Sequence, residues 1–90
     1  MSALGVSVAQ YAPRASSAEN LAAMGPLVAE AAQAGSHLVV FPEYSHAFTP
    51  GLGAEWAGTG ESLEGVFVSG LTSLSKDNGG IVIIAGMLVA

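Results

Sequence analysis

Two uninterrupted apolar runs constrain the fold of this chain more than any other feature. Residues 37–41 (HLVVF) form the first run, which Pro42 ends, and residues 81–85 (IVIIA) form the second. A strand with one face in water alternates apolar and polar residues, whereas strands buried on both faces are continuously apolar and belong to parallel sheets covered by helices. The two runs therefore predict buried strands of a parallel sheet.

The residues before the first run predict another strand and a helix. Apolar residues alternate with small ones over 4–9, which is typical of a strand. Residues 16–19 (SSAE) have the form of a capping box, and apolar residues then recur at helical spacing up to Gly35, which suits a helix C-terminus. Pro26 lies inside this pattern and cannot donate a backbone hydrogen bond, so we expect a kink there or a helix that restarts at Pro26.

A second helix and the last strand complete the pattern. Leu63, Phe67, Leu71 and Leu74 recur at helical spacing, and residues 76–79 (KDNG) end the stripe. The order β-α-β-α-β indicates an α/β fold with right-handed crossovers and a parallel sheet. Two helices can hardly cover both faces of that sheet, and residues 87–90 (MLVA) bring no turn. We therefore expect residues 1–90 to be the N-terminal, incomplete portion of a larger α/β domain.

Composition excludes several classes of function. Hydrophobic residues make up 51% of the chain. Charged residues make up only 10%, whereas typical globular chains contain about 25% charged residues. This composition agrees with an apolar surface that further residues, of the same chain or another, would bury. The net charge of −5, with only two basic residues, argues against nucleic acid or anionic lipid as a partner. No apolar stretch reaches the ~20 residues that a bilayer requires, and no export signal is visible, so we expect a cytoplasmic protein.

Glu43 is the candidate catalytic residue. Ligands of open α/β sheets bind beyond the carboxyl ends of the strands, and Glu43 directly follows the buried run and Pro42. A carboxylate at the rim of an apolar sheet loses hydration, which makes it a better proton acceptor. Tyr44, Phe48 and Trp56 follow and could form pocket walls. From spacing alone, a solvated loop residue or a helix-capping partner is the commoner role of such a carboxylate, since many lie on loops without a function.

Residues 34–45 (AGSHLVVFPEYS) resemble the first catalytic signature of the carbon–nitrogen hydrolase family, also called the nitrilase superfamily. That signature is a helix ending in Ala-Gly, an apolar strand and then Phe-Pro-Glu. The opening strand that ends at residues 9–10 and the later segment 76–86 fit the same frame. The resemblance covers nearly all ninety residues but only about the first third of a typical family domain.

The resemblance implies an αββα sandwich that hydrolyses non-peptide C–N bonds with a Glu-Lys-Cys triad and no cofactor. Glu43 matches the family's general base, and Tyr44 matches a position that often lines the substrate pocket. The family's Lys and Cys signatures lie later in its chain, and these ninety residues contain no Cys. Lys76 is better explained by its place near a helix C-terminus, where a cation complements the helix dipole.

The family frame also suggests substrate and assembly. Residues 41–45 (FPEYS) resemble the amidase branch of the omega-amidase or deaminated-glutathione-amidase type, with carbamoyl-amide hydrolases as the nearest rival. The resemblance implies a small-molecule amide substrate and a homo-oligomer for the full-length protein.

Other patterns are weaker. Residues 58–63 (GTGESL) lack the third Gly of a dinucleotide fingerprint, and the His and Glu residues show no metal-ligand spacing. Two alternatives stay open beside the enzyme. One is a catalytically inactive fragment or small α/β interaction module, and the other, disfavoured by the incomplete sheet, is a flavodoxin-like binding domain.

Overall fold

The computed structural model of the chain describes residues 4–48 and 58–89. Three strands and two helices alternate along them: β1 (Val6–Val8), α1 (Ser17–Gln33), β2 (Leu38–Val40), α3 (Val66–Asp77) and β3 (Val82–Ile84). All three strands are parallel, in the order β1-β2-β3, with Val39 of β2 opposite Ser7 on one side and Ile83 on the other. The predicted β-α-β-α-β order and the α/β class are confirmed, and the strands are shorter than the apolar runs.

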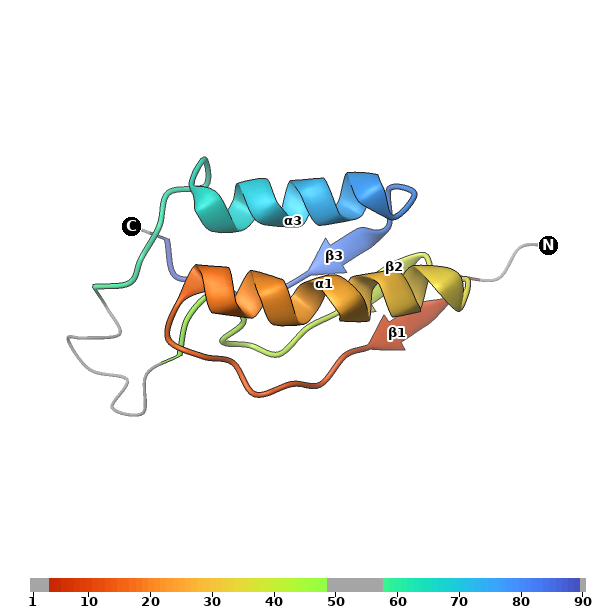
Figure 1. Cartoon of the computed structure of the whole chain (residues 1–90), viewed down its shortest axis with the longest axis horizontal. Coiled ribbons are helices and arrows are strands. Elements are labelled where there is room, and N and C mark those ends of the chain that lie inside the picture. The colour runs from red at the N-terminus through yellow and green to blue at the C-terminus, as the bar shows by residue number, and fades with distance from the viewer. Residues whose placement is uncertain (1–3, 49–57, 90) are drawn as a thin grey trace.

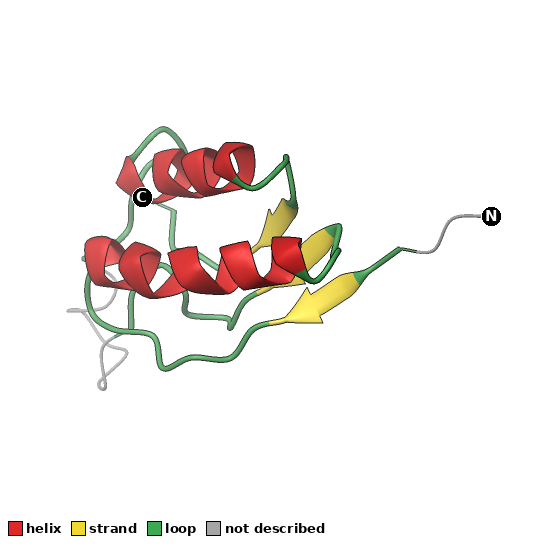
Figure 2. Ribbon diagram, turned by 45° about the vertical axis from the view of Figure 1, so that its right-hand side comes forward, coloured by secondary structure: helices red, strands yellow, loops and turns green. Residues whose placement is uncertain are grey.

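The two helices form one layer over one face of the sheet (Figures 1 and 2). Between the layers lies a core centred on Met24 and Val28 of α1, Val39 of β2 and Phe67 of α3, all fully buried. Ala31, Phe41 and Ile81 complete the buried cluster. Because both helices cover the same face, the core is one-sided.

The other face of the sheet is apolar and exposed. Val6 and Val8 of β1 and Val82 and Ile84 of β3 are each at least half exposed. Val39 of β2 is fully buried in the core, and Ile83 of β3 packs against the same core and is partly buried. The expectation that two helices leave part of this sheet uncovered is confirmed, whereas burial of both faces is not found within the described residues.

Local signals at α1 agree with the sequence, with one exception. The Ser16 hydroxyl accepts from the Glu19 backbone N–H at 3.2 Å and donates to the Glu19 carboxylate at 3.0 Å. Gly35 adopts a left-handed conformation (φ +86°) just after the helix, as a C-terminal glycine should. The helix does not restart at Pro26: α1 is continuous through it, because one missing N–H is tolerated where neighbouring packing holds the helix.

The second helix begins later than the apolar stripe suggested. α3 starts at Val66, and Leu63 lies before it, 62% exposed, while Phe67 is fully buried. Among the described residues, neither helix is both long and apolar enough to cross a bilayer.

Candidate functional site

Glu43 lies where the sequence predicts, at the carboxyl end of the central strand. β2 ends at Val40, and Phe41 still donates its N–H to the carbonyl of Ile84 at 2.8 Å. The chain then turns at Glu43 and Tyr44. Glu43 is exposed, so the described residues do not provide the desolvation that the position at the sheet rim suggests.

A pocket of about 300 Å³ lies at this end of the sheet. Two segments line it, one after β2 and one after β3: Glu43, Tyr44, His46 and Ala47, and Gly86, Met87 and Leu88. Apart from Glu43 and His46, its lining side chains are apolar or aromatic. Tyr44 lines the pocket, and its ring centroid lies 5.5 Å from that of Phe48 with the two ring planes tilted by 52°. Phe48, also expected as a pocket wall, is not among the lining residues. The arrangement is a small, mainly apolar pocket with one exposed carboxylate at its edge.

Two hydrogen bonds fix the loop that carries Glu43, one within the loop and one from Tyr11 in the segment after β1. Ser45 is fully buried, and its hydroxyl donates to the carbonyl of Pro42 at 2.6 Å, which closes the turn around Glu43. The Tyr11 hydroxyl donates to the carbonyl of Ser45 at 3.2 Å. Burial raises the pKa of Tyr11, so this hydroxyl stays a donor at neutral pH.

Asn20 ties the same loop to α1. Its side chain is fully buried and makes three hydrogen bonds: the amide donates to the carbonyls of Arg14 and His46, both at 2.9 Å, and the side-chain oxygen accepts from the Arg14 N–H at 2.7 Å. A buried amide with its partners in place is costly to replace, because each partner would lose its bond. No sequence pattern indicated this role, because Asn20 lies among the polar residues at the start of a helix.

Glu61 and His46 form a further contact that sequence reasoning missed. The Nε2 of His46 lies 2.9 Å from one carboxylate oxygen of Glu61, which also accepts from the Ser17 hydroxyl. The other oxygen accepts from the backbone N–H of Phe67 at 2.9 Å. The Ser17 hydroxyl, then the Phe67 N–H and His46, lower the pKa of Glu61 to about 2 against some opposition from burial. Glu61 is therefore ionised at neutral pH.

Gly86 brings the segment after β3 against the backbone of Glu43. A Cβ added at Gly86 would lie 2.0 Å from the carbonyl oxygen of Glu43. The Gly86 carbonyl also accepts from the His46 N–H at 3.2 Å. Only a residue without a side chain permits this approach, so the Glu43 turn packs directly against the backbone of Gly86.

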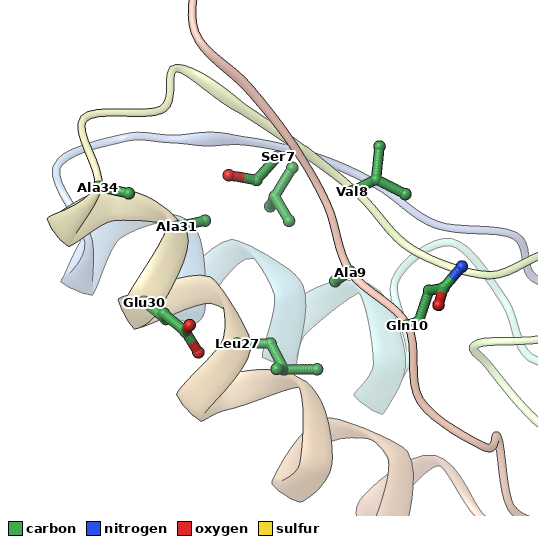
Figure 3. A pocket seen from close by; sticks show the side chains of 9 residues that line it. Ser7, Val8, Ala9, Gln10, Leu27, Glu30, Ala31 and Ala34 are labelled. Carbon is green, nitrogen blue, oxygen red and sulfur yellow. The ribbon is translucent and has the colours of Figure 1, made fainter.

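A second pocket, of about 230 Å³, lies between β1 and α1 (Figure 3). Glu30 is its one ionisable lining residue, and the pocket reaches the carboxyl end of β1 at Val8 but not the segments that follow β2 and β3. The described residues contain no group of three His, Cys, Asp or Glu able to hold a metal ion. Trp56, expected as a pocket wall, and Glu55 lie outside the described residues.

Comparison with known families matches the model described as carbon-nitrogen hydrolase to residues 5–90. The match spans all five elements and the pocket at the strand tips. No curated protein matches the chain.

Proposed function

Because the chain belongs to the carbon–nitrogen hydrolase family, we propose that it supplies the general base of an enzyme that hydrolyses a small-molecule amide, with Glu43 as that base. One observation carries this proposal. Glu43 is the exposed carboxylate at the edge of the strand-tip pocket, on a turn that Ser45, Tyr11 and Gly86 hold in place. Catalytic and binding residues occur disproportionately on loops that a rigid scaffold positions, and the turn of Glu43 is such a loop.

In the proposed reaction Glu43 accepts the proton of a Cys thiol as the sulfur attacks the amide carbonyl, and it returns that proton to the leaving amine. The resulting thioester is hydrolysed by water. A thiol is mostly protonated at neutral pH, so a base placed to accept its proton as the sulfur attacks makes the thiol an effective nucleophile. A Lys would stabilise the oxyanion of the tetrahedral intermediate. We propose that this Lys and Cys lie outside these ninety residues, which form the N-terminal portion of the domain.

Tyr44 is proposed as a substrate-binding residue, because it lines the same pocket as Glu43. We favour a substrate of the amidase branch, an omega-amide or deaminated-glutathione-like compound, on the resemblance of residues 41–45. We also propose a homo-oligomer and a cytoplasmic location.

The test is ammonia release from omega-amides of short dicarboxylic acids, with N-carbamoyl compounds as the rival panel. It uses the product of the whole reading frame that contains these residues. Glu43→Gln should lower kcat about 10²–10⁴-fold, the usual contribution of a general base. Glu30→Gln is the matched control, an exposed carboxylate in the other pocket, and should leave kcat unchanged. Full activity of Glu43→Gln would refute the assignment.

The alternative is a catalytically inactive fragment or small α/β interaction module, which the exposed apolar face of the sheet favours. The reading frame distinguishes the two. A Lys and then a Cys in family-like context after residue 90 support the enzyme, and a stop codon there supports the module.

A further inference from the structure

His46 is a buried side chain whose ring nitrogens are both engaged. Its side chain is 2% exposed, and the ring packs against that of Phe67 with centroids 5.2 Å apart. The backbone N–H of Leu88 donates to Nδ1 at 3.4 Å, so the ring proton lies on Nε2 and is donated to Glu61. Both ring nitrogens are therefore engaged by contacts within the fold.

Glu61 is the point at which three segments meet. Its carboxylate accepts from Ser17 at the start of α1, from the Phe67 N–H in the first turn of α3 and from His46 in the loop after β2. The N-cap residue of α3 is Gly65, which offers no capping side chain, so Glu61 supplies the acceptor. Its own backbone is fixed as well, because the Glu61 N–H donates to the carbonyl of Leu88 at 3.0 Å.

His46 also connects this network to the turn that carries Glu43, because its backbone makes hydrogen bonds to the neighbouring segments. Its N–H donates to the Gly86 carbonyl and its carbonyl accepts from the Asn20 side chain. Glu43 lies three residues earlier, inside the turn that Ser45 closes. If the His46 ring is released, the turn keeps its internal hydrogen bond but loses the side-chain attachment that fixes its place over Gly86.

We propose that Glu61 is a positioning residue for Glu43: by holding the His46 ring, it fixes the turn on which the catalytic carboxylate stands. This inference rests on the proposed function. Glu61 and His46 do not touch the substrate's reacting atoms in this scheme. The pair acts through the geometry of residues 42–46, and misplacement of a catalytic group by about 1 Å can cost about 10²-fold in rate.

The test compares Glu61→Gln with Val28→Ala in the product of the whole reading frame. Gln has a single oxygen, so it can accept either from the Phe67 N–H or from Ser17 and His46, and its NH₂ group then faces the donors on the other side. Val28→Ala removes buried volume from the core under α1, away from the turn, and controls for loss of stability alone. Well below both melting temperatures, Glu61→Gln should lower kcat about 10–10²-fold with a smaller change in KM. Val28→Ala should lower the melting temperature and leave kcat unchanged.

Two NMR measurements test the positioning independently of turnover. The ¹⁵N shifts of the His46 ring should show the Nε2–H tautomer in the wild type and lose that signature in Glu61→Gln. The His46 amide should exchange faster in Glu61→Gln while the Val39 amide keeps its protection. A wild-type kcat in Glu61→Gln, an Nδ1–H tautomer in the wild type, or unchanged His46 exchange would each overturn the inference. These outcomes can be distinguished from failure of the proposed function. If Glu43 is not the base, Glu43→Gln keeps full activity, while the exchange of the His46 amide still shows whether Glu61 holds the turn.

Discussion

Gly86→Ala is expected to displace the turn that carries Glu43. The new Cβ would meet the Glu43 carbonyl oxygen at 2.0 Å and the Glu43 carbonyl carbon at 2.9 Å, whereas ordinary contacts begin at 3.4 Å. The Cβ is fixed to the backbone of residue 86 and meets backbone atoms of Glu43, so no side-chain rotation relieves the clash. The segments must separate by about 1.4 Å to restore an ordinary contact with the oxygen.

The cost follows from that displacement. Overpacking of a well-filled site costs typically about 1–3 kcal/mol, and rigid backbone on both sides puts this position at the upper end. Separation also stretches the 3.2 Å hydrogen bond from the His46 N–H to the Gly86 carbonyl, which contributes about 0.5–1.5 kcal/mol. We therefore expect Gly86→Ala to lower the free energy of unfolding by about 3 kcal/mol and kcat for amide hydrolysis by about 10²-fold.

Urea denaturation followed by circular dichroism measures the first quantity and ammonia release the second. Gly25→Ala is the matched control: its Cβ would lie 3.6 Å from a Leu74 methyl, an ordinary contact, in the middle of α1. Alanine favours a helix over glycine by about 0.5–1 kcal/mol, so this variant should be slightly more stable and fully active. A Gly86→Ala protein with wild-type midpoint and kcat would show that the approach of residue 86 to Glu43 does not position the turn.

Three further predictions follow from the network and the exposed sheet face. Folding lowers the pKa of Glu61 from an ordinary 4.5 to about 2, so its contribution to stability is complete above pH 4.5 and is lost as the pH falls toward 2. Because the side chain is 23% exposed, we expect this contribution to be about 1–2 kcal/mol. Glu61→Gln should therefore lose less stability than the wild type between neutral pH and acid. Asn20→Leu should lower the free energy of unfolding by about 2–4 kcal/mol in urea melts, because buried carbonyls of the Arg14 and His46 loops lose their donor; a change below ~0.5 kcal/mol would contradict this account. The ninety-residue chain alone should bind a hydrophobic dye and self-associate in sedimentation experiments, and Val82→Thr with Ile84→Thr should reduce both, whereas cooperative unfolding of a dye-free monomer would argue against an uncovered face.

Local patterns made much of this fold predictable. The apolar runs at 37–41 and 81–85, the capping box at residue 16 and the glycine at residue 35 each depend on neighbours within a few positions. The position of Glu43 followed from the same kind of signal, since the residue after a buried parallel strand must lie at the sheet's carboxyl edge. The course of α1 through Pro26 was not predictable locally, because tertiary packing decides whether a helix tolerates the missing hydrogen bond.

The contacts that fix the site connect residues far apart in sequence, and no periodicity encodes them. His46 meets Glu61 across fifteen positions, and Glu43 meets Gly86 across forty-three. One signal was available: a helix whose N-cap is Gly65 needs an acceptor from elsewhere, and Glu61 is a nearby carboxylate. The partner histidine could not be chosen in this way, because the sequence offers two histidines and only the fold places one beside Glu61.

Positioning and dehydration of Glu43 have different origins in this fold. Positioning comes from contacts within residues 4–89, where Ser45, Asn20 and Gly86 hold the turn from three sides. Dehydration does not, because both helices lie over one face of the sheet and leave Glu43 and the opposite face exposed. A carboxylate that is placed but hydrated is a weak base, and removal of water strengthens its interaction with a nearby thiol proton. The proposed chemistry therefore requires a surface that covers the strand tips and brings the Cys, so that one event both dries the base and delivers the nucleophile.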